Sequence, residues 1–282
     1  PSGSQAGQSR QGEFFHRYII GLYDVLGRIF GPRPEVLLES CASGGNRFDL
    51  GMLCYSPQIW TSDNIDPIER LTIQGGMSLF YPLSTMGSHV ADSPHSQTLR
   101  KTSLATRFHL AAFGCLGYEF NLNFLDRLQR REIREQVEFY KKHRRTFQFG
   151  RFYRLPALKD NKIHWQVVSE DKRESLAGYY QTWQRAAEGF DLLPLTGLEP
   201  ERQYKLTTRP LRLELERFGN LINHLLPVQI KSTNPLLRLT GKFYTLPDSA
   251  ESYEASGRQL QAGVMLNTHF SGTGYNAKVR ML

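Results

Sequence analysis

The sequence predicts an α/β segment followed by an all-β segment, and three observations support this order. Up to about residue 150, short apolar runs that end in polar loops alternate with stretches of helical periodicity. Beyond that point, short aromatic and β-branched runs are separated by Gly, Pro, Asn and Asp. The length of 282 residues suits roughly two domains. We therefore expect one domain at 1–150 and a second at 151–282.

The elements of the first segment follow from the spacing of apolar residues. The opening helix, 13–30, has such residues at helical spacing and is stopped by the Gly and Pro residues of 31–34. Asp66 and Pro67 form an N-cap and first-turn pair, so a second helix begins there. The full order is a helix at 13–30, strands at 35–40 and 55–64, a helix at 65–80, a strand-like unit ending near 90, a mixed segment at 103–122 and a basic helix at 127–145.

The second segment predicts an antiparallel sandwich. Its apolar runs are short, and turn residues separate them at close intervals, as in all-β domains. The runs expected to form strands lie at 162–171, 174–184, 189–198, 201–208, 237–246 and 263–282.

The formal net charge of +8 is concentrated in one place. Most of the excess lies on Arg127–Arg145, where acids such as Glu135 and Glu138 follow or precede bases at helical spacing. We interpret this run as the solvated face of an amphipathic helix. A nucleic-acid-binding module is not recognisable, so we expect no nucleic-acid partner.

Cysteine usage and hydropathy exclude several further classes. Three cysteines without a CxxC spacing are incompatible with a disulfide framework or a zinc ribbon, and we expect Cys54 and Cys115 in the core. No apolar run approaches the length of a membrane span, so no membrane association is expected. The absence of a signal peptide and the free cysteines favour a cytoplasmic location.

The stretch Glu39 to Arg70 carries the candidate chemistry. It places a Cys–Ala–Ser–Gly–Gly loop after one strand and a Trp–Thr–Ser–Asp–Asn loop after the next. Loops at the carboxyl ends of barrel strands converge on one mouth. Aromatic rings that pack on C–H faces, together with carboxylates and amides that bind hydroxyls, suit a sugar ligand. The residues alone therefore predict a carbohydrate site.

The other polar residues in and near this stretch are weaker candidates for a chemical role. Asp66 is better placed than Asp63 to cap the following helix, and we interpret it as structural. Asp49 and Arg47 are candidates for a pair that holds the loop. His89 and His95 lack an evident third ligand, so no metal site is expected. Ser43 and Ser62 lack a recognisable activating histidine, which argues against a serine hydrolase.

Four long segments resemble the α-galactosidases of glycoside hydrolase family 36. They are HRYIIGLYDVLGRIF, LLESCASGGNRFDLGML, YSPQIWTSDNIDPIERLTIQGGMSLFYPLSTMGSHVADSP and FYKKHRRTFQFGRFYRL. The resemblance runs from about Gln11 to about Leu206 and is strong through Leu155. It implies the later strands of a (β/α)8 TIM barrel over 1–150 and a C-terminal antiparallel β-sandwich over 151–282.

The activity that this resemblance implies is retaining hydrolysis of terminal α-galactose from oligosaccharides such as melibiose and raffinose. Such enzymes use two carboxylates, a nucleophile and a general acid/base. The family's acid/base lies in the WTSD loop and matches Asp63. Cys41 and Gly44 match positions that line the galactose pocket, and Trp60 is a candidate wall of it. Asn46 and Ile65 depart from the usual pattern, which puts fine specificity in doubt. No cofactor or metal is implied.

The resemblance also implies that part of the active site lies elsewhere. The family's nucleophile belongs to a Lys–Trp–Asp–Met–Asn type motif, which this sequence lacks and which family spacing would place before Pro1. We therefore expect a fragment that is inactive alone. The alternatives are a non-catalytic half that needs a partner chain, and an α-N-acetylgalactosaminidase or raffinose-family galactosyltransferase of the same fold. A homo-oligomer is a further possibility, since family members often assemble as one.

Overall fold

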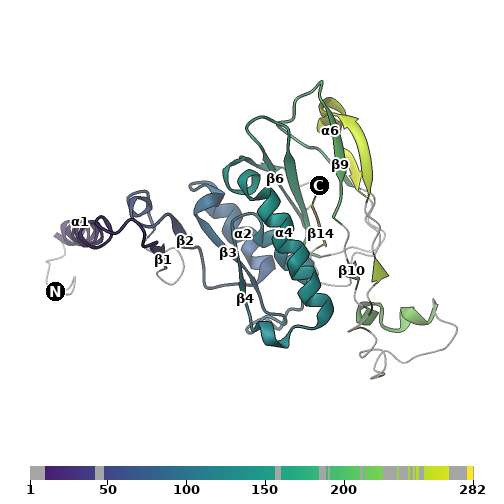
Figure 1. Ribbon diagram of the computed structural model, residues 1–282, viewed down its shortest axis with the longest axis horizontal. Helices are drawn as coiled ribbons and strands as arrows, with labels where there is room; N and C mark the ends of the chain where they lie inside the picture. Colours follow the sequence, from purple (N-terminus) through teal and green to yellow (C-terminus); the bar gives the residue numbers. More distant parts are fainter. Residues whose placement is uncertain are drawn as a thin grey trace. The chain divides into compact units, whose positions relative to one another are not determined.

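A computed structural model describes most of the chain, which divides into two compact units (Figure 1). The first unit is Pro1–Asp63 with Thr85–Gly87, and the second is Asn64–Ser84 with Ser88–Leu282. The structure describes residues 10–41, 48–155, 160–183, 189, 191–209, 212–213, 215–224, 234, 241, 244, 246–247, 251–266 and 278–281.

The first unit holds one helix and a small parallel sheet. Its elements are α1 (Gln11–Phe30), β1 (Glu39–Ser40), the 3-10 turn η3 (Met52–Cys54), β2 (Gln58–Trp60) and the first residues of β3 (Met86–Ala91). β1 and β2 are parallel, as are β2 and β3. The expected helix at 13–30 is present, but the strand expected at 35–40 forms only at its last two residues. The N–H of Val36 bonds the carbonyl of Arg33 in a turn, which removes that residue from the ladder.

Tyr23 attaches α1 to the loop before β2. Its ring stacks on Tyr55 at 5.7 Å between centroids, and its hydroxyl donates to Asp49. The Asp49 carboxylate also accepts from the N–H of Met52 at 2.8 Å. Burial and the neighbouring Asp49 raise the pKa of Tyr23 to about 12. Asp49 thus fixes the loop through Tyr23, while Arg47, its expected partner, lies outside the described residues.

The second unit begins with helices that alternate with strands. Its elements up to residue 149 are α2 (Pro67–Met77), η4 (Leu83–Thr85), the remainder of β3, α3 (Leu104–Ala111), β4 (Cys115–Glu119), η5 (Leu122–Phe124) and α4 (Arg127–Phe149). β3 and β4 are neighbours in the sheet. The buried Gln74 connects α2 to β3 and to the segment after α3. Its amide donates to the carbonyl of Phe113 and accepts from the hydroxyl of Ser88.

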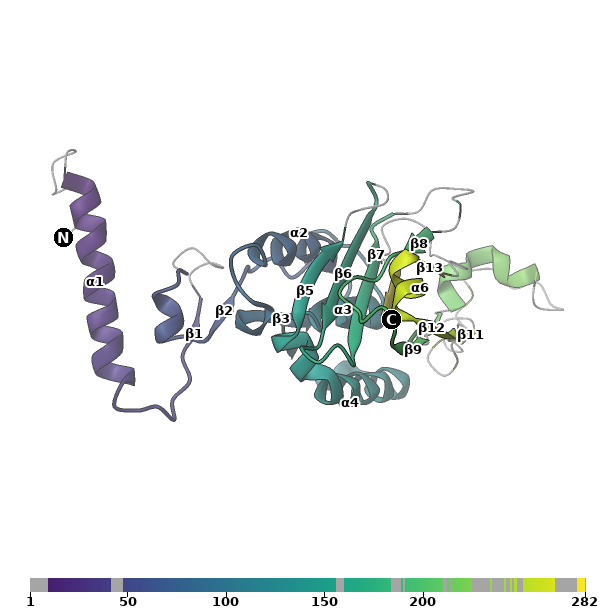
Figure 2. The ribbon, with the colours of Figure 1, turned by 90° about the horizontal axis from the view of Figure 1, so that it is seen from above.

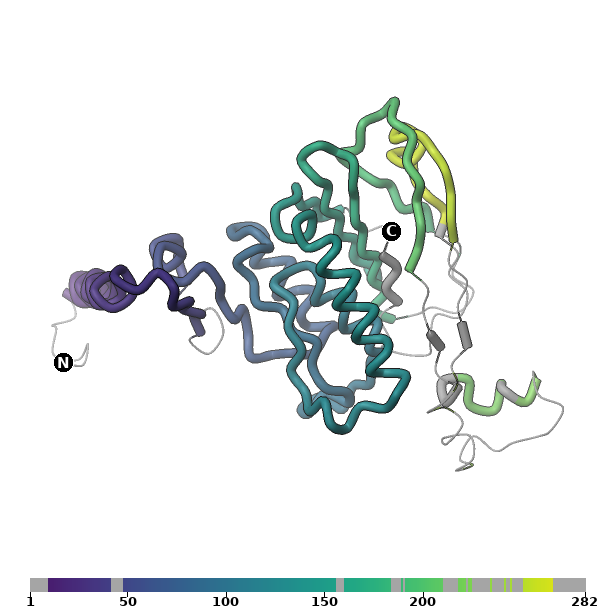
Figure 3. Tube along the Cα trace, viewed as in Figure 1, coloured from purple at the N-terminus to yellow at the C-terminus, as the bar shows by residue number. Residues whose placement is uncertain are grey.

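The basic helix expected at 127–145 is α4, which continues to Phe149. Asp126 begins it with a capping box, in which its side chain accepts from the N–H of Gln129. Of the ion pairs expected along it, Arg131 and Glu135 meet at 2.9 Å. Tyr140 and Phe147 are buried, and the basic side chains point into solvent. Figure 3 shows α4 running alongside the strands that follow it.

After α4, the strands that the structure describes pair in antiparallel fashion, as the sequence predicts. β5 begins at Arg151, directly after α4, and Figure 2 shows β5, β6 and β7 side by side. One sheet has the order β14-β7-β6-β5, and two-stranded ladders pair β8 with β13, β9 with β12 and β10 with β11. The bounds are β5 (Arg151–Leu155), β6 (Lys162–Val168), β7 (Ser175–Gln181), β8 (Asp191–Leu193), β9 (Gln203–Thr207), β10 (Arg212–Leu213), η6 (Leu215–His224), β11 (Leu246–Pro247), β12 (Ser252–Ser256), α6 (Gly257–Ala262), β13 (Val264–Leu266) and β14 (Lys278–Met281).

An apolar core joins β6 and β7 to the shorter ladders. Eight buried residues make up this cluster: Val168, Ala177, Tyr179, Leu193, Leu195, Leu198, Leu206 and Leu260. Most of the run expected as a strand at 237–246 lies outside the described residues.

A buried polar group lies at one end of this core. Lys162 and Asp191 form an ion pair in which both side chains are almost fully buried. The hydroxyl of Tyr179 donates to the same carboxylate at 2.5 Å. The ring of His164 packs on Tyr179 at 5.0 Å between centroids, and neither of its ring nitrogens has a hydrogen-bond partner among the described residues. Burial is the main cause that lowers the pKa of His164 to about 4.

His164 predicts a loss of stability in mild acid. The unfolded chain takes up a proton near the ordinary pKa of 6.5, whereas the folded chain does so only near 4. The contribution of the neutral, buried His164 to stability is therefore complete above pH 6.5 and is lost as the pH falls toward 4. Between pH 7 and pH 5 we expect the free energy of unfolding to fall by about 2 kcal/mol from this group.

Urea unfolding of the chain, followed by tryptophan fluorescence at several pH values, measures this loss. The variant His164→Leu removes the buried imidazole and flattens the pH dependence. The exposed His16 of α1 provides the control, since His16→Leu should leave the slope unchanged. A His164→Leu variant whose free energy of unfolding still falls as steeply with pH would contradict the assignment of this loss to His164.

Candidate active site

β1 and β2 are parallel neighbours, so their carboxyl ends lie at the same edge of the sheet (Figure 1). Cys41 comes directly after β1, Trp60 ends β2, and Asp63 follows three residues later. Ser40 pairs with Ile59, so Cys41 and Trp60 occupy adjoining positions in the register. Cys41 and Asp63 are exposed and Trp60 is partly buried. The register thus places Cys41 beside Trp60, with Asp63 three residues further along the chain, while Gly44 lies outside the described residues.

One edge of the Trp60 indole lies against the backbone of β3. Trp60 pairs with Gly87, and a Cβ atom on that glycine would lie 3.2 Å from Cε3 of the indole and 3.1 Å from the carbonyl oxygen of Ile59. A Cβ at this position would therefore require the ring or the strand to shift by a few tenths of an ångström. Gly87 is therefore a support for Trp60 that the sequence did not single out.

We expect Gly87→Ala to displace the indole of Trp60. With Trp165 and Trp183 replaced by phenylalanine, Trp60 is the single tryptophan, and acrylamide quenching of its fluorescence reports its exposure. The displaced ring should be quenched more strongly than in the parent, because overpacking shifts the side chains at the contact. Gly76→Ala is the control, because nothing lies within 4 Å of a Cβ there. Equal quenching in the parent and in Gly87→Ala would refute the contact.

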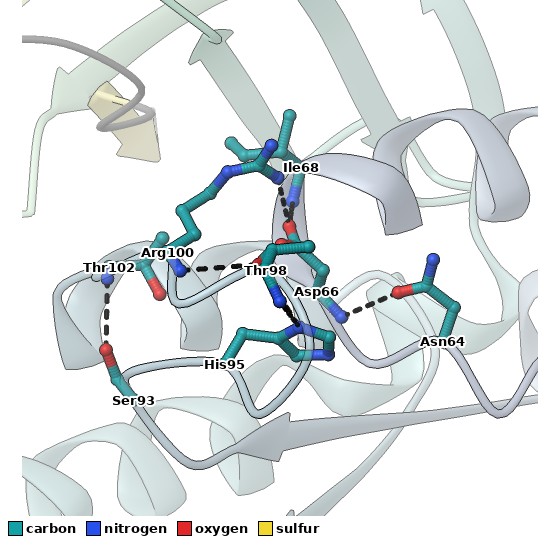
Figure 4. Close-up of polar contacts among 8 residues, drawn as sticks. All are labelled: Asn64, Asp66, Ile68, Ser93, His95, Thr98, Arg100 and Thr102. Carbon is teal, nitrogen blue, oxygen red and sulfur yellow. Dashed lines mark hydrogen bonds and ion pairs between the residues drawn. The ribbon is translucent and has the colours of Figure 1, made fainter.

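Asp66 begins α2, as predicted, and is fully buried (Figure 4). Its Oδ1 accepts from the N–H of Ile68 at 2.9 Å and from Arg100 at 2.5 Å, and its Oδ2 accepts from the Thr98 hydroxyl at 2.8 Å. Its own N–H donates to the side chain of Asn64 at 3.1 Å. Burial acts to raise the pKa of Asp66, but the hydrogen bonds from Thr98 and Ile68 and the charge of Arg100 outweigh it, so the pKa is lowered.

Thr98 and Arg100, the side-chain donors to Asp66, come from the loop between β3 and α3. In that loop the N–H of Thr98 donates to Nδ1 of His95, and the N–H of His95 donates to the carbonyl of Arg100 (Figure 4). His89 instead faces Glu119, with Nδ1 3.2 Å from its carboxylate. The two histidines therefore have different partners. In the part of the chain that the structure describes, no three His, Cys, Asp or Glu side chains come together as a metal site would require.

Neither of the remaining cysteines is buried as expected. Cys54, which was expected in the core, is exposed. It ends the single turn η3, in which Met52 is the buried residue. Cys115 is partly buried, and its thiol donates to the carbonyl of Ser84 at 3.0 Å. None of the helices within the described ranges has the length and apolar character that a membrane crossing requires.

Two family models match the chain. The Melibiase model matches residues 2–150, and the model of the glycosyl hydrolase family 36 C-terminal domain matches residues 162–282.

Curated proteins with similar sequences are alpha-galactosidases. The chain is 45% identical over 198 residues to alpha-galactosidase AgaA of Geobacillus stearothermophilus and 43% identical over 196 residues to alpha-galactosidase Mel36A of Lactobacillus acidophilus. Each match covers 70% of this chain and 27% of the relative, so the chain spans about a quarter of the relatives' length.

Solved structures of such enzymes have the same fold over nearly the whole chain. An alpha-galactosidase from Lactobacillus brevis superposes with a TM-score of 0.73 at 33% identity, covering 99% of this chain and 33% of the other. A variant of AgaA in complex with raffinose superposes with a TM-score of 0.74 at 34% identity, covering 98% of this chain and 32% of the other.

Proposed function

Because the chain belongs to glycosyl hydrolase family 36, we propose that it supplies the acid/base side of a retaining α-galactosidase active site. In this proposal Asp63 protonates the leaving oxygen of the glycosidic bond and then activates the water that releases galactose. The substrates are oligosaccharides with a terminal α-galactose, such as raffinose, which a related enzyme holds in its solved structure.

The difference between the two aspartates of one loop carries the assignment of Asp63. Both oxygens of Asp66 are occupied by Ile68, Thr98 and Arg100, and its carboxylate is buried. A carboxylate held in this way is unsuited to exchange protons with a substrate. Asp63, three residues earlier, is exposed at the carboxyl edge of the parallel strands, where barrel enzymes place their catalytic groups.

The neighbouring residues complete one wall of the sugar pocket. Cys41 and Trp60 lie at the same edge as Asp63, and Gly44 belongs to the loop that follows Cys41. The indole would pack on the C–H face of galactose, while the small residues leave room for the ring. We assign residues 1–150 to the later strands of a (β/α)8 barrel and residues 151–282 to a C-terminal β-sandwich.

The second carboxylate would come from another polypeptide segment. A Lys–Trp–Asp–Met–Asn type motif does not occur in the 282 residues. Complementation tests this arrangement: hydrolysis of an aryl α-galactoside is measured with the chain alone and after co-expression with the part of AgaA that the chain does not cover. Activity only in the mixture supports the proposal. Full activity of the chain alone would require a different nucleophile and would overturn it.

A further inference from the structure

A cavity of about 390 Å³ lies within the second unit. It is bounded by α4, by β7 with the turn that precedes it, by β9 and by α6. This volume is near the lower end of the range for small-molecule sites, so the cavity suits a compact ligand. None of the residues that line it has a role in the proposed galactosidase mechanism.

The floor of the cavity is apolar. It is formed by five leucines and one alanine from β7, β9, α6 and the segment after β8, all of them buried: Leu176, Ala177, Leu195, Leu198, Leu206 and Leu260. Such a surface offers few hydrogen-bond partners, so it does not suit the hydroxyl groups of a sugar. It suits an aromatic ring with a short hydrocarbon chain.

His143 of α4 is a polar residue at the wall of the cavity, and its imidazole is held in one orientation. One carboxylate oxygen of Glu174 lies 2.6 Å from its Nδ1, and the hydroxyl of Thr146 donates to the other oxygen. The ring of Phe139 packs on the imidazole at 4.5 Å between centroids. A side chain fixed in this way loses little conformational freedom when a ligand binds, which lowers the cost of binding.

The pairing with Glu174 determines what the other ring nitrogen of His143 can do. An ionised carboxylate only accepts hydrogen bonds, so Nδ1 is the donor of this pair. In the neutral imidazole Nε2 is then an acceptor. Among the described residues, Nε2 has no hydrogen-bond partner. The cavity therefore combines an apolar floor with an acceptor that lacks a donor.

Two other polar side chains of the lining are already engaged. The hydroxyl of Tyr204 donates to the carbonyl of Lys172 at 2.8 Å. The hydroxyl of Ser175 accepts from the amide of Gln166, also at 2.8 Å. We therefore assign the polar end of a ligand to the imidazole of His143.

We propose that this cavity binds a small phenol, whose hydroxyl donates to Nε2 of His143 and whose ring packs on the apolar floor. A phenol joins a hydrogen-bond donor to an apolar ring, so it matches both parts of the lining. The proposal uses none of the residues assigned to sugar chemistry, so it stands or falls independently of the proposed galactosidase function.

Isothermal titration of the chain with 4-propylphenol, at a mildly alkaline pH where the imidazole is neutral, tests the proposal. We expect one molecule to bind per chain. 4-Propylanisole has the same ring and alkyl chain without the hydroxyl donor. It should bind about three- to tenfold more weakly, as the loss of one neutral hydrogen bond requires. His143→Phe should weaken the binding of 4-propylphenol by about the same factor.

His89→Phe is the matched control for this substitution. Nδ1 of His89 also faces a carboxylate, that of Glu119 at 3.2 Å, but His89 does not line the cavity. The affinity for 4-propylphenol should therefore be the same in His89→Phe as in the parent.

A second measurement uses the unaltered chain and so does not depend on whether a variant folds. In nitrogen-15 NMR spectra of the imidazoles, the Nε2 signal of one histidine should move upfield with 4-propylphenol and stay in place with 4-propylanisole. Equal affinities for these two compounds, tighter binding of 4-propylbenzoate than of 4-propylphenol, an unchanged affinity in His143→Phe, or no binding of 4-propylphenol would each overturn the proposal.

Discussion

Asp63→Asn in the complemented enzyme is expected to lower kcat for raffinose by about 10²- to 10⁴-fold, the usual contribution of general acid–base catalysis. An amide cannot protonate the leaving oxygen, and raffinose has a poor leaving group that needs this proton. An aryl α-galactoside with an acidic phenol needs little assistance in its first step. The loss in that first step should therefore be much smaller for the aryl substrate than for raffinose.

The comparison between substrates separates a catalytic role from a structural one. Pre-steady-state release of the phenol measures the first step directly, and raffinose turnover measures the assisted reaction. Asp24→Asn is the control, because Asp24 is an exposed aspartate of the same unit, paired with Arg28 on α1. An equal loss on both substrates would mean that Asp63 supports the loop rather than donating a proton.

Local sequence signals were sufficient for α1, α2 and α4, whereas α3 lies in a segment left as mixed and α6 in the part expected to be all-β. The Asp66–Pro67 pair marked the start of α2, and the periodicity of 127–145 marked α4, because caps and amphipathic spacing are properties of neighbouring residues. The order of a parallel and then an antiparallel part was also predicted correctly. Strand lengths were not, since the turn at Arg33 and Val36 shortens β1 in a way that an apolar run does not reveal.

Contacts between distant residues account for what the sequence did not show. Lys162 and His164 alternate with apolar residues, and a sequence pattern would place such side chains in water. Lys162 is buried together with Asp191, 29 residues away, whose carboxylate meets its ammonium group, and His164 is buried against the ring of Tyr179. In the candidate site, the role of Asp66 as a cap was predictable, but its partner Arg100 is 34 residues away.

Asp66→Ala is expected to lower the free energy of unfolding by about 3–4 kcal/mol. The substitution removes the N-cap of α2, which costs about 1 kcal/mol. It also takes the carboxylate from Arg100, whose side chain is only 19% exposed, and breaking such a buried pair costs several kcal/mol. Urea denaturation measures the loss. Asp66→Asn should cost less, because the amide oxygen still accepts from the N–H of Ile68.

The exposed Asp171 shows why burial decides the size of this effect. Its carboxylate accepts from the Ser169 hydroxyl and from the N–H of Arg173, so its local hydrogen bonds are like those of Asp66. Because water replaces these contacts, Asp171→Asn should cost much less stability than Asp66→Ala. The pH dependence of the free energy of unfolding gives a second test of the role of Asp66. The lowered pKa of Asp66 means that its contribution is present above the ordinary value of 3.8 and is lost as the pH falls through the folded-state pKa. An Asp66→Ala variant that unfolds at the same urea concentration as the parent would show that Thr98 and Arg100 hold the loop without it.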